Sequence, residues 1–156
     1  LYPHYSQRPT GRELNGEHMQ TPTESRVLEA ADAIVQAFAA TDTERYFAGF
    51  AADASFIFHT DAERLNSRAE YESLWASWLA DGWRVRSCVS SNRLVQAFPG
   101  GAVFSHDVAT EIEVDGERDA YTERETIVFA VTESGALRAV HEHLSPTPDA
   151  ETEAPA

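Results

Sequence analysis

The sequence contains no lysine, and all 12 of its basic residues are arginines. Its 26 acidic residues leave a formal net charge of −14. A surface with this charge repels the phosphates of nucleic acids and the headgroups of anionic membranes, so neither is expected as a partner. The same acidity favours solubility and is also typical of proteins from salt-adapted or GC-rich bacteria.

Cysteine is almost absent as well. Cys88 is the only cysteine, so an internal disulfide is impossible, and we expect it to be a buried small residue. No hydrophobic run approaches the roughly 18 residues of a membrane helix, and the first residues lack an apolar signal core. The sequence has no glycine-rich phosphate loop and no nucleophile elbow. These absences predict a cytoplasmic protein without a nucleotide site.

Both ends of the sequence differ from its middle. Residues 1–20 show no helical or strand period and are predicted to be a peripheral extension, in which His4 and His18 have no role. The His18-Met19 pair is similar to a cloning junction, which makes Met19 a candidate for the natural start. Residues 147–156 are acidic and rich in proline, which predicts a solvated tail. Residues 21–146 have the length of one domain.

Three segments carry the start signals of helices. Residues 21–24 form a capping box with proline at the first helical position, and apolar residues follow at helical spacing as far as Phe38. Residues 41–44 and 67–70 predict the starts of two further helices, and Asp81-Gly82 predicts the end of the last one. All three helices therefore lie in the first part of the chain.

The remainder of the sequence has the period of strands. A short strand is predicted at residues 54–60, before the third helix. Four long strands are predicted at residues 83–98, 102–114, 118–132 and 136–145. The turn signals between them are Pro99-Gly100-Gly101, Asp115-Gly116 and Ser134-Gly135. Helices followed by an antiparallel meander predict an α+β fold, in which the helices cover one face of the sheet.

Tight turns would also fix how these strands pair. If Asp115-Gly116 and Ser134-Gly135 are two-residue loops, one face of the sheet gathers small and polar side chains. That face carries Val103, Ser105, Asp107, Ala109, Thr122, Arg124, Thr126, Val128, Ala139, His141, His143 and Ser145. The opposite face carries Phe104, His106, Val108, Ile127, Phe129, Val140 and Leu144, with Glu125 and Glu142.

We predict that the small polar face is concave and lines a pocket against the helices, because small side chains leave space. The bulkier face would then need a cover. A second copy of the chain would supply it, which predicts a homodimer packed sheet against sheet, with His106 beside Glu125 at the interface. The reverse assignment stays open, because an apolar face also suits a helix layer.

The order of elements, the segment Val140-His141-Glu142-His143-Leu144-Ser145 and the triplet Arg124-Glu125-Thr126 together resemble a known superfamily. Over about residues 24–146 the chain resembles the nuclear transport factor 2-like superfamily, and within it the SnoaL-like and ketosteroid-isomerase-like group. The resemblance implies a cone-shaped sheet wrapped around three N-terminal helices, a cystatin-like roll. It also implies that Arg124, His141 and His143 face a small-molecule pocket.

Two features depart from this group. Relatives often carry a tryptophan where Leu137 stands. The catalytic set of a ketosteroid isomerase is incomplete: Tyr46 and Asp107 stand in plausible places, but the strand aspartate that acts as base is missing, with His59 nearby. Steroid isomerisation is therefore not supported.

The polar face supplies the candidate catalytic residues. His143 is predicted to be the general acid or base, with His141 assisting, Asp107 orienting the ring and Arg124 anchoring the substrate. The alternative is that Asp107 and Arg124 form a cross-strand ion pair and the histidines are hydrogen-bonded core residues. Two histidines at i, i+2 with an aspartate nearby could bind a metal, which leaves metal-dependent hydrolysis as a lesser alternative. A metal site usually has three firm ligands, so no metal and no cofactor are predicted.

The remaining pocket residues are predicted to bind the ligand: His59, Tyr46, Trp75, Trp78, Thr126, Ser105 and Ser145. At this helical spacing, Trp75 and Trp78 more often belong to a hydrophobic core than to a ligand site. The predicted function is a cofactor-independent isomerase, cyclase or dehydratase of a carbonyl-bearing, mainly apolar small molecule. The alternative is a non-catalytic ligand-binding or oligomerisation domain, because a fold does not determine a function.

Overall fold

The computed structural model describes residues 19–149. The predicted N-terminal extension, with His4 and His18, therefore lies outside the described residues except at its last two positions, and so does most of the predicted tail. Within the described residues, no helix is both long enough and apolar enough to cross a membrane.

Three helices form where the sequence signals them: α1 at Glu24–Ala39, α2 at Thr43–Ala48 and α3 at Arg68–Ala80. Helix α1 begins later than predicted, because its cap is Thr23, whose hydroxyl accepts the backbone N–H of Arg26. Thr21 is therefore not the cap. The side chains of Asp42 and Ser67 cap α2 and α3 in the same way, each accepting a backbone N–H three residues on.

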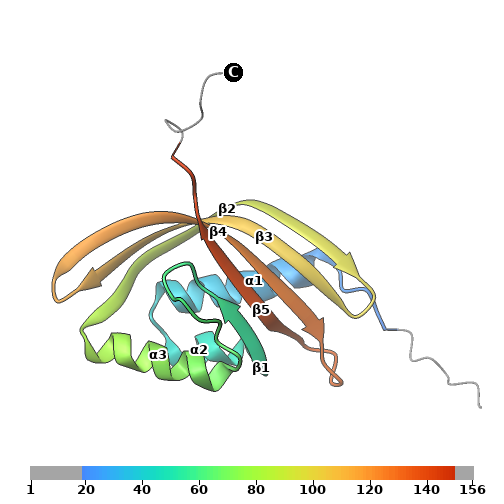
Figure 1. Cartoon of the computed structure of the whole chain (residues 1–156). Coiled ribbons are helices and arrows are strands. Elements are labelled where there is room, and N and C mark those ends of the chain that lie inside the picture. Colours follow the sequence, from blue (N-terminus) through green and yellow to red (C-terminus); the bar gives the residue numbers. More distant parts are fainter. Residues whose placement is uncertain (1–18, 150–156) are drawn as a thin grey trace, which may run out of the picture.

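Five strands form one curved sheet that wraps over the helices (Figure 1). They are β1 at Phe50–Ile57, β2 at Trp83–Phe98, β3 at Gly101–Val114, β4 at Glu117–Val131 and β5 at Leu137–Pro146. Their order is β1-β5-β4-β3-β2, and β1 pairs with β5 in parallel. The predicted α+β class and the four-stranded meander are confirmed, while β1 begins four residues before the predicted start at residue 54.

The predicted pairing between β3 and β4 is confirmed. Val114 pairs with Glu117, so Asp115-Gly116 is a two-residue loop, and both loop residues have positive φ angles of 50° and 84°. That is the geometry of a type I′ turn, whose twist matches that of the flanking strands. Asp107 consequently lies opposite Arg124 in the ladder.

The turn between β4 and β5 is longer than predicted. Val131 pairs with Leu137, and the backbone N–H of Thr132 donates to Ala136 O, so a three-residue loop lies between Thr132 and Ala136. A bulge at Val140 then corrects the register, so that the predicted pairing of Val128 with His141 is found. The bulge places Ala139 on the opposite face from the predicted one.

The assignment of the two sheet faces was wrong. Phe104, Ile127 and Phe129 are at most 1% exposed and pack against the helices, so the bulky face is the concave one. Burying such a side chain stabilises the fold by roughly 1.5–3 kcal/mol, which outweighs any space left by small residues. The polar face, with Asp107, is the convex outer surface.

The predicted homodimer loses its original basis with this correction, because the helices already cover the apolar face. Dimerisation through the sheet stays a prediction.

Candidate functional site

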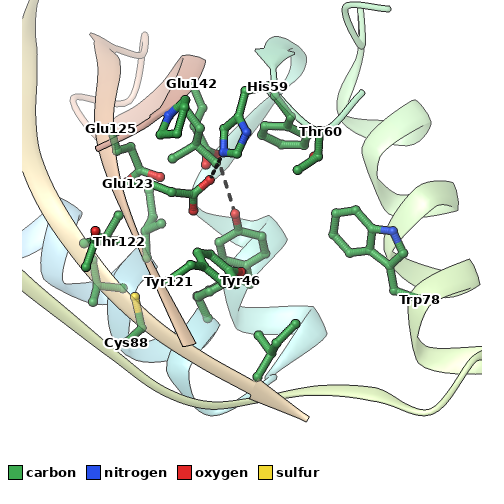
Figure 2. Close-up of a pocket in the computed structure, with 18 of the residues that line it drawn as sticks. Tyr46, His59, Thr60, Trp78, Cys88, Tyr121, Thr122, Glu123, Glu125 and Glu142 are labelled. Atoms are coloured by element: carbon green, nitrogen blue, oxygen red, sulfur yellow. Dashed lines mark hydrogen bonds and ion pairs between the residues drawn. The ribbon is translucent and has the colours of Figure 1, made fainter. Parts of the chain in front are cut away.

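A cavity of about 490 Å³ lies between the concave face of the sheet and the helices (Figure 2). Its walls are mostly apolar and aromatic, and its size is typical of small-molecule sites. Trp78 and Trp83 form part of the wall at the α3 side. The polar groups converge from β4, β5 and the segment after β1.

Two glutamates form the polar floor of the cavity. Glu125 on β4 and Glu142 on β5 lie on neighbouring strands, and both side chains line the cavity. Glu142 is only 2% exposed. Burial raises the pKa of Glu142 well above its ordinary value of 4.5, and the nearby charge of Glu125 raises it further. Glu142 therefore keeps its proton at pH values at which an exposed glutamate is already ionised.

Two tyrosines extend this floor toward the helices. The hydroxyl of Tyr46 on α2 lies 3.5 Å from Glu142 Oε2 and 3.1 Å from the hydroxyl of Tyr71 on α3. Burial raises the pKa of both tyrosines well above 10.0, so both hydroxyls remain hydrogen-bond donors. The ring of Tyr46 stacks on Trp75 and meets the ring of Tyr71 edge to face, which fixes Tyr46 in place.

His106 supports the glutamate pair from β3. Its Nε2 lies 2.7 Å from Glu125 Oε1, and its Nδ1 lies 2.5 Å from the hydroxyl of Ser90. The histidine side chain is 0% exposed. His106 is thus inside the protein, rather than at the predicted dimer interface.

A second acid–base pair borders the cavity. His59 Nε2 lies 2.5 Å from Glu123 Oε2, and their side chains are 32% and 11% exposed. Burial raises the pKa of Glu123, and the hydrogen bond from His59 partly offsets that rise. Figure 2 shows the two side chains pointing toward each other beside the cavity. Because His59 is the more exposed partner, this pair lies nearer to solvent than the floor pair.

The charge of the cavity limits what it can bind. No arginine of the described part of the chain lines it, and the sequence has no lysine. Cys88 lines the wall as a neutral thiol, because burial raises the pKa of Cys88 to about 11. Neutral ligands with hydrogen-bond acceptors suit these carboxyl and hydroxyl groups better than anionic ligands do.

The four predicted catalytic residues do not line this cavity. His141, His143, Asp107 and Arg124 lie on the outer face. The Asp107 carboxylate accepts a hydrogen bond of 3.1 Å from Asn92, and His141 Nδ1 lies 2.8 Å from the hydroxyl of Ser55. Burial and the charge of His143 lower the pKa of His141.

The predicted ligand-binding residues divide into two groups. Tyr46, His59 and Trp78 line the cavity. Trp75 is fully buried in the core, where its Nε1 donates to Thr43 Oγ1 at 2.9 Å. Three further residues belong to the outer face with the polar ladder: Ser105, Thr126 and Ser145. No group of three or more metal-ligating side chains converges anywhere among residues 19–149.

The sequence reasoning missed the glutamates and His106 as site residues. The available signal was their position. Glu125, Glu142 and His106 alternate with Phe and Ile on an otherwise apolar face, and ionisable residues on a buried face are seldom there for packing alone.

Comparison with known proteins agrees with this fold. The profile of the SnoaL-like domain family matches residues 27–149. No curated protein matches the chain.

Several solved structures are similar in fold. A nuclear transport factor 2-like superfamily protein from Salmonella enterica has a TM-score of 0.72 at 14% identity, covering 85% of this chain and 96% of that one. A ketosteroid isomerase-like protein from Erwinia carotovora has a TM-score of 0.68 at 13% identity, covering 80% and 96%. A candidate calcium/calmodulin dependent protein kinase II association domain from Xanthomonas campestris has a TM-score of 0.66 at 20% identity, covering 82% and 91%. At these identities the likeness shows the fold.

Proposed function

The chain belongs to the SnoaL-like domain family, and from this membership and the chemistry of the cavity we propose that it is a cofactor-independent acid–base enzyme. Its substrate would be a small, mainly apolar, carbonyl-bearing molecule, and the reaction an isomerisation, cyclisation or dehydration. The observation that carries the proposal is the pair of Glu125 and Glu142 on the floor of an apolar cavity, next to Tyr46.

The floor groups would hold the carbonyl oxygen. The protonated carboxyl of Glu142 and the hydroxyl of Tyr46 both donate hydrogen bonds, and both line the cavity. Donors fixed in a site that excludes water stabilise the negative charge that develops on an oxygen when a neighbouring carbon loses its proton. A neutral carboxyl kept protonated by burial is a known means of doing this.

Glu123 would be the base. Its pKa is raised by burial, so its carboxylate holds a proton more strongly than an exposed glutamate does. In the proposed step the proton leaves the carbon next to the carbonyl and binds to Glu123, while the oxygen is stabilised by the floor. His59, hydrogen-bonded to Glu123, adjusts the basicity of that carboxylate. Returning the proton to another carbon completes an isomerisation.

Deuterium exchange into 2-tetralone tests this chemistry without the natural substrate. In D₂O, NMR measures how fast the protons next to the carbonyl are lost, with wild type, Glu123→Gln and Tyr46→Phe. We expect each variant to lose about 10²-fold or more of the enzyme-dependent rate. Asp107→Asn, the same acid-to-amide change on the outer face, is the matched control. Equal rates for wild type and Glu123→Gln would contradict the proposal.

Ligand binding without turnover is the second candidate, and the open cavity supports it as much as it supports catalysis. Quenching of the fluorescence of the cavity tryptophans by 2-naphthol, an enol analogue of 2-tetralone, measures binding alone. Binding of 2-naphthol without any exchange in 2-tetralone would favour the binding domain. A cytoplasmic location belongs to both candidates as a prediction, and cell fractionation tests it.

A further inference from the structure

Glu125 and Glu142 reach the same cavity from neighbouring strands, and two carboxylates sharing one poorly hydrated site repel each other when both are ionised, so we expect the pair to keep one proton. The environments of the two carboxyls differ. Glu125 Oε1 has a ring N–H donor beside it, at 2.7 Å from His106 Nε2. Glu142 has only the hydroxyl of Tyr46, at the longer distance of 3.5 Å. Glu125 and Glu142 therefore differ in how strongly they hold the proton.

His106 can donate to Glu125 in either protonation state. The hydroxyl of Ser90, 2.5 Å from Nδ1, can donate to a neutral ring or accept from a charged one. In both cases Nε2 carries its hydrogen toward Glu125. In the other neutral tautomer, His106 Nε2 carries no hydrogen. Glu125 Oε1 would then have to be protonated to keep the contact, and no hydrogen bond would be gained. The ring also packs on Phe104, with 4.6 Å between ring centres, which keeps it in this orientation.

We propose that His106 is a positioning residue, which holds Glu125 in its ionised form and so leaves the shared proton on Glu142, facing the cavity. A donated N–H favours the charged form of a carboxyl group, and charge-assisted hydrogen bonds are the stronger kind. The more buried Glu142, without an N–H donor, is then the less costly place for a neutral acid. This inference rests on the proposed function, since it says which carboxyl donates to the substrate oxygen.

The other ionisable groups around the pair are consistent with this arrangement. Glu123 from β4 adds negative charge and so favours a proton on Glu142. Tyr46 from α2 and Tyr71 from α3 are neutral, because burial raises their pKa values. Cys88 from β2 is a neutral thiol for the same reason. None of them is a cation that could ionise Glu142.

NMR of the full chain labelled with ¹³C-glutamate tests the position of the proton. The carboxyl carbon of Glu142, assigned by its loss in Glu142→Gln, reports the charge of that group directly. We expect the protonated signal at neutral pH in wild type. His106→Phe keeps an aromatic ring but removes the donor, so the Glu142 signal should move toward the ionised position and its titration midpoint should fall by about one pH unit or more. His106→Gln keeps an N–H donor and should stay near wild type.

Two further variants keep the test decisive. Glu125→Gln removes the neighbouring negative charge while keeping a side chain of the same size, so the titration midpoint of Glu142 should fall. A wild-type Glu142 signal at the ionised position at neutral pH would mean that the proton resides on Glu125 and would contradict the inference. His143→Phe makes the same substitution on the outer face and should leave Glu142 unchanged.

A Glu142 signal that keeps its position and midpoint in folded His106→Phe would overturn the inference. The measurement needs no substrate, so it is separate from the proposed function. A lack of exchange in 2-tetralone would leave the proton assignment intact. Normal catalysis with an unchanged Glu142 in His106→Phe would refute only the role of His106.

Discussion

Replacing Glu142 by glutamine should change how the stability of the protein depends on pH. The pKa of Glu142 is raised in the folded protein by burial, while in the unfolded chain it returns to about 4.5. The folded state therefore binds the extra proton between these two values. Its stabilising effect is fully present below the unfolded pKa and is lost as pH rises through the folded pKa.

The size of the effect follows from one proton. A difference of one bound proton changes the free energy of unfolding by about 1.4 kcal/mol for each pH unit of that window. The amide in Glu142→Gln keeps the hydrogen-bonding capacity of a protonated glutamic acid but cannot ionise, so this variant lacks the dependence. The variant should therefore gain on wild type by about 1.4 kcal/mol for every pH unit above 4.5, until the folded pKa is reached. For a chain of this size, each kcal/mol corresponds to roughly 2–4 °C in Tm.

Urea unfolding of both proteins at successive pH values between about 4 and 9 measures this difference. Glu123, whose pKa is also raised, is present in both proteins, so most of its own contribution cancels in the comparison. Glu29→Gln, at an exposed position of α1, makes the same change in net charge and should run parallel to wild type. A difference between Glu142→Gln and wild type that stays constant with pH would refute the reasoning, because the buried carboxyl would then ionise as in the unfolded chain.

Three further predictions concern the core, the sheet and the outer face. Trp75→Ala should cost about 3–5 kcal/mol in urea unfolding, since the ring is fully buried, and Trp78→Ala should cost less but weaken the binding of 2-naphthol. Gly101→Ala should destabilise by about 1–3 kcal/mol, because the new Cβ would crowd the backbone carbonyl of Phe129; unchanged stability would contradict that close approach. His143→Ala should retain the rate of 2-tetralone exchange. A loss comparable to that of Glu123→Gln would indicate that the active site lies on the outer face of the sheet.

Light scattering coupled to size-exclusion chromatography tests the predicted homodimer. A dimer would have twice the chain mass of 17.2 kDa. Val128→Arg, on the outer face of β4, should then release the monomer, whereas dimers that persist in this variant would exclude packing through that part of the sheet.

Most of the fold could be predicted from local signals in the sequence. The Asp115-Gly116 turn determined the β3–β4 register, because Asp-Gly strongly favours a two-residue type I′ loop between twisted strands. The capping residues Asp42 and Ser67 marked helix starts for a similarly local reason. Such features depend on a few neighbouring residues, so they can be recognised in the sequence without knowledge of the fold.

The orientation of the sheet depended on distant residues and was not predicted. Side chains alternate regularly between the two faces of the sheet, so the two-residue period alone could not decide which face the helices cover. The apolar stripe of α1, with Val27 and Ile34, needed the face that carries Phe104, and packing energy decided the choice. The histidines at 141 and 143 were then misleading, because they sit one residue away from the acid that lines the cavity.

The extra turn residue and the bulge at Val140 offset each other, so that Leu137 and Glu142 both face the core. In the same sequence, a two-residue turn without the bulge would point Leu137 outward while Glu142 still reached the cavity. The bulge leaves Val140 without a ladder partner between Ala139, which lies opposite Phe129, and His141, which lies opposite Val128. Deleting Val140 would join these two pairs into a regular ladder, so a single alignment gap at this position keeps the cavity acid in its place on the strand.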